Sequence, residues 1–368
     1  MGTRGSLLAR TQSGHVAGAV TDMWALHVGV GVGAGAATDL GAGAATDLVR
    51  EVIIRTEGDD TTTSLTAGTG ARPGVFVSAL RDALLAGEVD FIVHSFKDLP
   101  SAPFEGIALA AVPLREDERD VLVSNTGVGL ADLPAGAVVG TSSPRRAARI
   151  LFARPDLAVK PIRGNIDTRI QKVRTGEYDA TILAAAGLNR VGYSAEACEF
   201  LGVDMLLPAP AQGALAVECR SDDLELLEVL YGLNDPESRL VTTAERAVLV
   251  GVAATCATAI GALGVLENGQ LTVTAELSDP DSNEHERFGV SVPMDAANYN
   301  SPAALREAYE TGLFVAAQLM ATELGMRIRG VGAATGNGGA AADGGRSAGN
   351  GGRFAAEGGH SAADGGAN

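Results

Sequence analysis

The chain has 368 residues, of which 46% are hydrophobic, enough for packed cores and too many for a wholly disordered protein. Its 28 basic residues face 45 acidic ones, giving a net charge of −17, and only three of the basic residues are lysines (Lys97, Lys160 and Lys172). No apolar run approaches the ~20 residues of a membrane-spanning helix, the first residues lack a secretion signal, and the three cysteines fit neither a disulfide framework nor a C-x-x-C metal site. We therefore expect a cytoplasmic protein without a metal, and the acidic, lysine-poor composition suggests a halophilic source.

Two segments lack the pattern of a folded core. Residues 33–48 contain the unit GAGAATDL twice, which we interpret as a duplication in a tolerant loop. Residues 331–368 are so rich in glycine and alanine that they cannot bury enough apolar surface to offset the entropy of ordering. We expect this tail to be disordered.

Between these segments, helical and strand patterns alternate. The segments that predict helices are 75–88, 144–153 and 165–177. The segments that predict buried strands are 89–95, the start of 135–143, 160–164 and 178–187. This alternation indicates α/β layers with largely parallel sheets. Residues 264–292 instead predict antiparallel strands joined at an Asn-Gly turn, and 301–325 predict one or two helices.

Residues 141–174 form a cationic island in this anionic chain. The island carries +7, whereas the rest of the chain carries −24. Its nine basic residues are Arg145, Arg146, Arg149, Arg154, Lys160, Arg163, Arg169, Lys172 and Arg174. The sequence TSSPRR follows a predicted strand and begins a helix, where backbone N–H groups and hydroxyls can converge on an anion. Because arginine also suits two-point recognition of carboxylate and phosphate, the island predicts an anionic ligand.

Two alternatives remain open for this island. Arg149, Arg154, Lys172 and Arg174 occupy helical positions and would, in the first alternative, simply be solvated on helix faces. Nucleic acid is the second, but the island has no interleaved aromatic residues and the net charge of the chain would repel a polyanion.

The segment VHSFKDLP (93–100) and the cysteines are the remaining candidates for chemistry. Lys97 and Asp98 follow the carboxyl end of a predicted strand, where open α/β sheets bind ligands. A carboxylate there can hydrogen-bond a substrate N–H group or transfer a proton, although such a pair is more often an exposed ion pair. Cys256 lies in a loop of small residues without an adjacent base, so its local sequence favours an inert thiol, as it does for the other two cysteines.

Taken together, these segments resemble the hydroxymethylbilane synthase family, also called the porphobilinogen deaminases. The resemblance extends over about residues 1–330 and rests on segments that follow the family's order. They are TRGS (3–6), VHSFKDLP (93–100), VGTSSPRR (139–146), RGNIDTR (163–169), YDATILAAAGLNR (178–190), LPAPAQGALAVECR (207–220), TAERAVL (243–249) and the Cys256 loop. The combination of VHSxKD, TSSxRR and RGNxxTR is highly specific.

The resemblance implies a transferase that joins four porphobilinogen molecules head to tail into 1-hydroxymethylbilane, with release of ammonia, in porphyrin biosynthesis. It also implies a dipyrromethane cofactor, covalently attached to Cys256. Asp98 matches the catalytic aspartate, which is expected to hydrogen-bond pyrrole N–H groups and to stabilise the positive charge of the azafulvene formed as ammonia leaves. The acetate and propionate groups of each porphobilinogen unit would explain the cationic island.

Other positions match the family's ligand-binding residues. Those implied to bind the cofactor are Lys97, Ser143, Arg145, Arg146, Arg169 and Arg190, and those implied to bind substrate are Arg4, Ser6 and Arg163. The resemblance implies no partner other than the small substrate, neither nucleic acid nor a membrane, and it implies a monomer.

The implied fold is α/β, with two domains similar to periplasmic binding proteins around a cleft and a smaller α+β domain with an antiparallel sheet. The first domain is expected to be discontinuous, over 1–113 and 214–231, and to carry the catalytic aspartate. The second, over 114–213, is expected to carry the basic clamp, and the third, over 232–330, the cysteine loop. Hinge motion would make room as the product lengthens.

The sequence departs from the family's pattern around the anchoring cysteine. The two glycines that precede it are Ala254 and Thr255 here, and the proline that follows it is Ala259. Since glycine is the residue that adopts a positive φ at low cost, we expect the loop to follow an altered path.

Two further departures lie elsewhere. A glycine of the 207–220 segment is Ala211, and the glycine-rich loop at 66–74 lacks the family's lysine. The altered cysteine loop motivates an alternative function, a cytoplasmic protein that binds porphobilinogen or another small carboxylate anion without turnover, whereas the retained Asp98 and the arginines argue against it.

Overall fold

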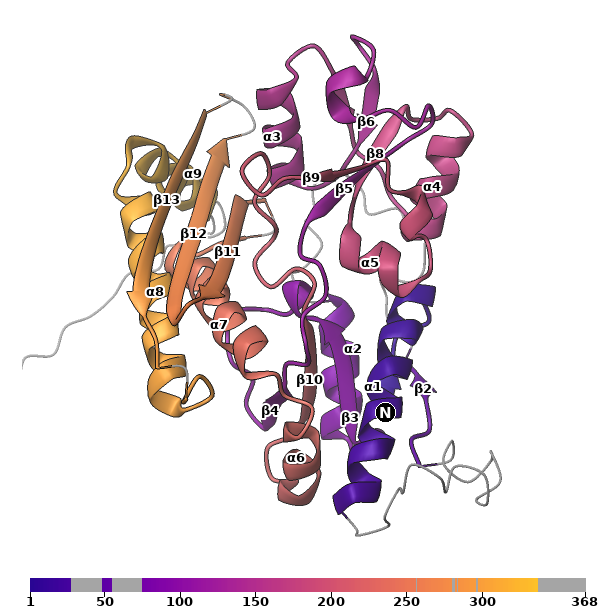
Figure 1. Cartoon of the computed structure of the whole chain (residues 1–368), viewed down its shortest axis with the longest axis vertical. Helices are drawn as coiled ribbons and strands as arrows, with labels where there is room; N and C mark the ends of the chain where they lie inside the picture. Colours follow the sequence, from indigo (N-terminus) through magenta and orange to yellow (C-terminus); the bar gives the residue numbers. More distant parts are fainter. Residues whose placement is uncertain are drawn as a thin grey trace, which may run out of the picture. The chain divides into compact units, whose positions relative to one another are not determined.

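The structure, a computed structural model, describes residues 1–27, 48–54, 75–255, 257–279, 282, 284–295 and 297–336. Contacts divide the chain into two units, Met1–Arg329 and Gly330–Asn368. The first unit contains three sheets, each with its own helices (Figure 1). The predictions for residues 33–47, for the loop at 66–74 and for residues 337–368 lie outside the described residues.

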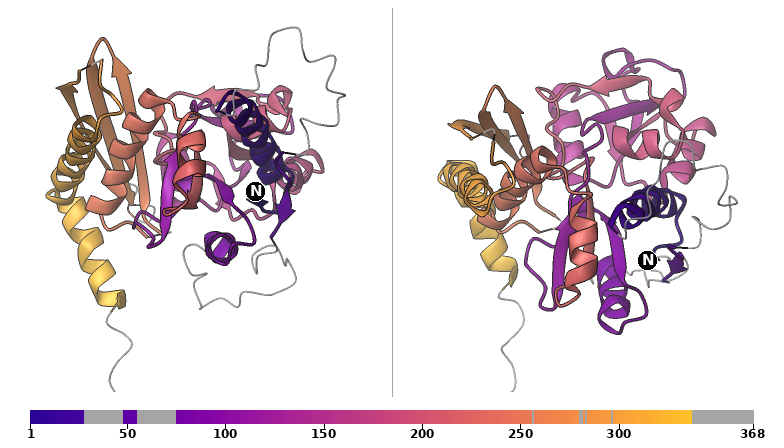
Figure 2. Two further views of the ribbon diagram at one scale, coloured as in Figure 1. Left: turned by 90° about the horizontal axis from the view of Figure 1, so that it is seen from below. Right: turned by 60° about the horizontal axis from the view of Figure 1, so that its bottom comes forward.

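The first sheet has the strand order β2-β1-β3-β10-β4, and every strand except β10 runs in the same direction. Its elements are β1 (Gly2–Thr3), β2 (Val52–Ile53), β3 (Phe91–Ser95), β4 (Ile107–Ala111) and β10 (Leu215–Arg220), with helices α1 (Leu7–His27), α2 (Val75–Leu85) and α6 (Leu224–Tyr231). Side chains alternate between the two faces along β3. Phe91 and Val93 pack with α1 and α6 on one face, whereas Ile92 packs with α2 on the other (Figure 2).

The second sheet has the order β7-β6-β8-β5-β9, and every strand except β5 runs in the same direction. Its elements are β5 (Asp120–Ser124), β6 (Val138–Gly140), β7 (Ala158–Lys160), β8 (Ala180–Ala184) and β9 (Glu199–Leu201), with helices α3 (Pro144–Ala153), α4 (Ile166–Arg174) and α5 (Ala185–Arg190). Ile150 of α3 packs on one face with Leu122 and Ile182, and α4 and α5 pack on the other with Val121 and Leu183.

In both sheets, the antiparallel strand is the first strand in sequence order after the chain has crossed over from the other sheet. Strand β5 follows β4 of the first sheet, and β10 follows β9 of the second. The prediction of largely parallel sheets is therefore confirmed, with one antiparallel strand inserted into each.

The third sheet is smaller and antiparallel, in the order β11-β12-β13. Its elements are β11 (Ala259–Glu267), β12 (Gln270–Asp279) and β13 (Glu284–Pro293), with helices α7 (Pro236–Gly251), α8 (Pro302–Met320) and α9 (Glu323–Gly336). The predicted Asn-Gly turn is confirmed, since Asn268 and Gly269 have φ values of 51° and 72° and Glu267 pairs with Gln270. Two α/β layers and a smaller antiparallel sheet thus agree with the expected fold class.

Some predicted boundaries are wrong. Strand β7 ends at Lys160 and does not include the next residues, because Pro161 has no N–H group for a sheet. The predicted strand at 178–187 ends at Ala184, after which α5 begins. Helix α9 continues to Gly336, six residues into the segment for which we expect disorder. Among the residues described, no helix is both long and apolar enough to cross a membrane.

Candidate active site

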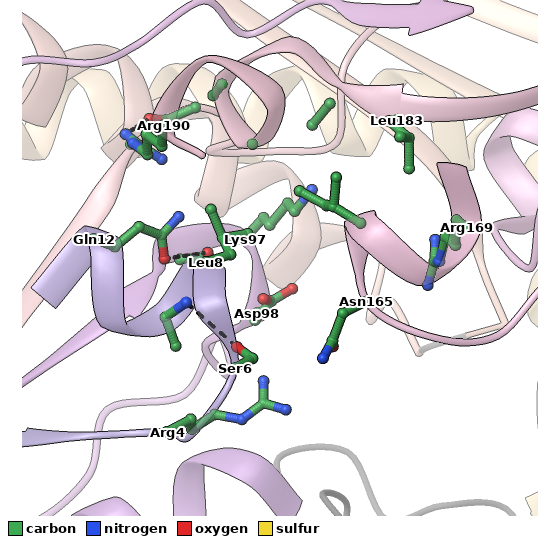
Figure 3. A pocket seen from close by; sticks show the side chains of 18 of the residues that line it. Arg4, Ser6, Leu8, Gln12, Lys97, Asp98, Asn165, Arg169, Leu183 and Arg190 are labelled. Carbon is green, nitrogen blue, oxygen red and sulfur yellow. Dashed lines mark hydrogen bonds between the residues drawn. The ribbon is translucent and has the colours of Figure 1, made fainter. Parts of the chain in front are cut away.

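A cavity of about 260 Å³ lies between the first and second sheets and gathers many of the predicted site residues (Figure 3). Its charged lining residues, among those described, are Arg4, Lys97, Asp98, Arg146, Arg169 and Arg190. The uncharged polar side chains of its lining are Ser6, Gln12, Ser95 and Asn165. Segments far apart in the sequence therefore supply five cations and one carboxylate to the same cavity.

One wall of the cavity is the turn between β1 and α1, which carries Arg4. The Ser6 hydroxyl accepts a hydrogen bond from the Ala9 amide at 3.3 Å and so satisfies a free N–H group in the first turn of α1. Further along α1, the amide oxygen of Gln12 accepts a hydrogen bond from the Ser95 hydroxyl at 3.2 Å. The first bond caps the start of α1, and the second connects α1 to the end of β3.

The turn that carries Asp98 follows β3 as a single 3-10 turn, η2 (Phe96–Asp98). Arg246 of α7 donates hydrogen bonds to the carbonyl oxygens of Phe96 at 3.0 Å and Leu99 at 3.1 Å, and its guanidinium lies over the Phe96 ring at 4.5 Å. Burial lowers the pKa of Arg246 to about 10, which leaves it charged at neutral pH. Arg246 therefore holds the backbone of the turn in place, while the carboxylate of Asp98 remains exposed.

Lys97 lies beside Asp98 in the cavity, in a much less polar environment than water provides. Burial lowers the pKa of Lys97 to about 8, against the opposing effect of the Asp98 charge. The ammonium group donates a hydrogen bond to Oε1 of Gln212 at 3.2 Å. Lys97 is therefore mostly charged at neutral pH and loses that charge in mildly alkaline solution.

Arg145 and Arg146 share one buried carboxylate. Asp120, the first residue of β5, is fully buried and accepts hydrogen bonds from Arg145 Nη2 at 2.7 Å and Arg146 Nη2 at 2.6 Å. Although burial disfavours the ionised carboxyl, the two guanidiniums hold the pKa of Asp120 well below its usual range. Arg146 lines the cavity, whereas Arg145 donates through Nη1 to the Leu207 carbonyl at 2.5 Å and does not line it.

Two more arginines reach the cavity from helices of the second sheet. Arg169 of α4 donates to the Gly164 carbonyl at 2.8 Å, and Arg190, the last residue of α5, donates to the Gly213 carbonyl at 2.6 Å. Burial lowers the pKa of both guanidiniums, and the charge of Arg146 adds to this effect at Arg169. Because a guanidinium has five N–H donors and stays charged at neutral pH, each arginine keeps donors for a ligand.

Three predicted site residues do not line the cavity, and a fourth lies outside the described residues. Ser143 caps α3, where its hydroxyl accepts a hydrogen bond from the Arg146 amide at 3.4 Å. Arg145 is engaged by Asp120, and Arg163 is exposed beside the lining residue Gly164. The fourth is Cys256.

The rest of the cationic island is used by the protein itself. Arg149 is buried, with its Nε 3.1 Å from Oε1 of Glu276 on β12, so the helix-face alternative is wrong for this residue. The other three helical cations pair with nearby acids, Arg154 with Asp156, Lys172 with Glu177 and Arg174 with Glu196. These four positions need no ligand to explain them.

Sequence reasoning missed four polar residues at or next to the cavity, namely Gln12, Asp120, Asn165 and Gln212. Asp120 and Gln212 are fully buried; Asp120 begins the short strand β5 and Gln212 shortly precedes β10, positions that could have drawn attention to a buried polar group. Their partners are distant in the sequence, since Gln212 contacts Lys97 across 115 residues. No local spacing pattern reveals such a contact.

The charges define the kind of ligand that fits. Four arginines and a lysine favour a compound with several carboxylates, since guanidinium groups bind them in a planar, two-point manner. An ionised carboxylate only accepts hydrogen bonds, so Asp98 suits an N–H donor or a group on which positive charge develops.

Comparisons with known proteins agree with this chemistry. Residues 1–228 match the family described as "Porphobilinogen deaminase, dipyromethane cofactor binding domain". The porphobilinogen deaminase of Acidothermus cellulolyticus is 45% identical over 306 residues, which cover 81% of this chain and 85% of that protein. Porphobilinogen deaminase 1 of Streptomyces coelicolor is 49% identical over 275 residues, 73% of this chain and 79% of that protein. The porphobilinogen deaminase of Cutibacterium acnes is 43% identical over 339 residues, 87% of this chain and 93% of that protein.

Proposed function

This chain belongs to the porphobilinogen deaminase family and joins four porphobilinogen molecules into hydroxymethylbilane in tetrapyrrole biosynthesis. We propose that Asp98 is its catalytic carboxylate and that the surrounding cations bind the carboxylates of the growing chain. The observation that carries the proposal is that the described lining residues of one cavity include five cations and one carboxylate, the exposed Asp98. The reaction releases ammonia, so positive charge develops where the amine leaves, and a fixed carboxylate stabilises that charge.

The cofactor of the family, dipyrromethane, fits the described residues. It carries acetate and propionate groups and two pyrrole N–H groups, which match the five cations and the Asp98 carboxylate among the described lining residues. We assign its carboxylates to Lys97, Arg146, Arg169 and Arg190. When bound, it supplies the pyrrole to which the first substrate unit is joined. Its thioether link to Cys256 is part of the proposal and rests on the sequence around that cysteine.

The remaining predicted residues receive narrower roles. Arg4 and Ser6 line the same cavity from the β1–α1 turn, and we assign them to the carboxylates of the incoming substrate. Arg163 is exposed at the edge of the lining, and its proposed ligands are groups that extend beyond the cavity. Ser143 and Arg145 act through Arg146, the first by capping α3 and the second by sharing Asp120.

Asp98→Asn tests the catalytic assignment. The amide keeps the size of the side chain but removes its charge, so the rate of ammonia release from porphobilinogen should fall by about 10²-fold or more while the thermal unfolding temperature stays close to that of the wild type. Asp82→Asn, at an exposed position of α2, is the matched control and should leave the rate unchanged. Unimpaired ammonia release by Asp98→Asn would show that another group stabilises the charge.

The proposal extends to the organisation of the protein. The strands of the three sheets fall within 1–113 plus 214–231, within 114–213 and within 232–330, which supports three domains with these bounds. We also propose that the protein acts as a monomer, as the resemblance to the family implies, and that it works in the cytoplasm, as its cysteine usage suggests.

A further inference from the structure

The buried side chain of Gln212 connects Lys97 in the cavity with Asp120, the carboxylate shared by Arg145 and Arg146. Gln212 precedes β10 in the segment where the chain returns from the second sheet to the first, and it is fully buried. Its backbone is fixed, because its N–H group donates to the Ala209 carbonyl at 2.8 Å and its carbonyl accepts from Arg115 Nε at 2.8 Å. Little freedom remains for the side chain to take another position.

The orientation of the Gln212 amide follows from its neighbours. Its nitrogen donates to the Glu118 carbonyl at 2.7 Å and to Oδ1 of Asp120 at 2.9 Å. Both partners accept only, since Asp120 is ionised between Arg145 and Arg146. The amide nitrogen must therefore face Asp120, which leaves the oxygen facing the Lys97 ammonium group at 3.2 Å.

Burial is the largest effect that disfavours the charge of Lys97, and the charged groups around it act in both directions. The charged groups around it are Asp98 on the same turn, Asp120 on β5, Arg145 and Arg146 on α3, and the cavity cations Arg4, Arg169 and Arg190. Five of these seven groups are cations that repel an ammonium group, and Asp120 is already shared by two arginines. Within the described part of the chain, the Lys97 ammonium group donates a hydrogen bond to one acceptor, Oε1 of Gln212.

We propose that Gln212 is a positioning residue that holds the Lys97 ammonium group charged and in place beside Asp98. The inference deepens the proposed function, since Lys97 is there assigned to a cofactor carboxylate. In this arrangement Asp120 orients the amide of Gln212, and the amide oxygen in turn orients Lys97. One buried carboxylate thereby fixes both Arg146 and, through Gln212, Lys97.

The pKa of Lys97 can be measured without any reference to activity. The chain has only three lysines, so the full-length protein labelled with ¹⁵N at the lysine side chains gives three Nζ signals, and Lys97→Arg identifies the one from Lys97. The pKa of that signal should lie near 8 in the wild type. In Gln212→Met, which keeps the length of the side chain but not its acceptor, it should fall by about one pH unit.

A second variant separates the acceptor from the donor. Gln212→Glu keeps an oxygen toward Lys97, so the pKa of Lys97 should be equal to or higher than in the wild type. Gln318→Met, at an exposed position of α8, is the matched control and should change nothing. In the pH profile of kcat/KM, the decrease at alkaline pH should begin at lower pH in Gln212→Met but not in Gln212→Glu or in the control. A purely structural defect would lower kcat/KM without moving this part of the profile.

The outcomes distinguish this proposal from the one on which it rests. An unchanged Lys97 pKa in folded Gln212→Met, or a decrease of the same size in both Gln212 variants, overturns the role of Gln212 even if all proteins form product. If the pKa values change as expected but the wild type forms no product, the role of Gln212 stands and the proposed function fails. If Gln212→Met does not fold, a Lys97 pKa in Gln212→Glu below that of the wild type overturns the proposal.

Discussion

At the scale of single residues, some basic side chains of the cationic island line the cavity, whereas others form ion pairs within the protein. Of its nine basic residues, the described cavity uses Arg146 and Arg169, while most of the others are engaged by acids such as Asp120 and Glu276. The excess of positive charge in the sequence correctly predicted an anionic ligand. It did not show which arginines would face it, because their partners lie on strands far along the chain.

Ala253, one residue before the two positions at which the family has glycine, adopts a backbone conformation that favours glycine. Ala253, just after α7, has a φ of 51°, a left-handed conformation that an L-residue with a Cβ adopts at a cost of ~1–2 kcal/mol. Its side chain is exposed, so little packing is lost on its removal. The segment that leads from α7 to the loop therefore contains one strained residue, Ala253, whereas the altered path expected from Ala254 and Thr255 stays a prediction.

Ala253→Gly should consequently raise the free energy of unfolding by about 0.5–1 kcal/mol, because relief of the left-handed strain exceeds the added entropy of glycine in the unfolded chain. Urea denaturation measures this change. Ala317→Gly, at an exposed position inside α8, is the opposite control and should destabilise by about 0.5–1 kcal/mol. A decrease in stability for Ala253→Gly would mean that the left-handed position is not strained.

At the scale of elements, the first turn of α3 is tied to the start of β5 by ion pairs inside the second sheet. Asp120 accepts hydrogen bonds from Arg145, Arg146 and Gln212, so one carboxylate connects α3, β5 and the segment that leads to β10. Helix α3 itself was predicted with correct ends, because Ser143 and Pro144 are typical of the start of a helix. The tie to β5 has no such local signature.

Asp120→Asn should destabilise the protein by about 3–5 kcal/mol at pH 7, since it leaves two buried guanidiniums without their counter-charge. The folded-state pKa of Asp120 lies below its unfolded value, so its contribution is complete above about pH 5 and is lost as the pH falls below the unfolded pKa near ~4. The variant should therefore lose less stability between pH 5 and pH 3 than the wild type.

Chemical denaturation across this pH range tests the prediction. Asp156→Asn is the matched control, an exposed aspartate paired with Arg154, and it should have no measurable effect at pH 7. Equal stability of Asp120→Asn and the control at pH 7 would contradict the assigned role of the buried carboxylate.

At the scale of the whole molecule, the two segments that cross between the first and second sheets meet at one buried glutamate. Glu245 of α7 accepts hydrogen bonds from Arg115 Nη1 at 2.6 Å in the first crossing and from the Ala211 amide at 2.6 Å in the second. It also accepts from the Gly264 amide of β11 at 2.8 Å. The third sheet is thus attached to both crossings, where a hinge between the other two would lie.

The size of the cavity is consistent with such a hinge. Its volume of about 260 Å³ is below the ~300–1,000 Å³ typical of sites for drug-sized ligands, whereas a growing tetrapyrrole needs more room with each unit. We therefore expect the walls of the cavity to separate during elongation, with the backbone turning at the crossings near Arg115 and Ala211.

The sequence was most informative where a structural or chemical feature depends on residues that are neighbours in the chain. The turn with Lys97 and Asp98, the capped start of α3 and the Asn-Gly hairpin were all predictable from neighbouring residues. The contacts of Gln212, Asp120 and Glu245 were not, because each depends on how the crossing segments and sheets pack, and packing joins residues with no fixed spacing. These contacts hold the site together, whereas the local segments supply its reactive groups.

The central claim, that the chain builds its product on a cofactor attached to Cys256, is tested most directly by the intact mass of the full-length protein. The purified wild type should exceed its sequence mass by one dipyrromethane, and brief incubation with porphobilinogen should add whole pyrrole units, up to four. Cys256→Ser should show neither increase. A wild type that keeps its sequence mass before and after incubation, or a Cys256→Ser variant that gains the same increments, would contradict the account.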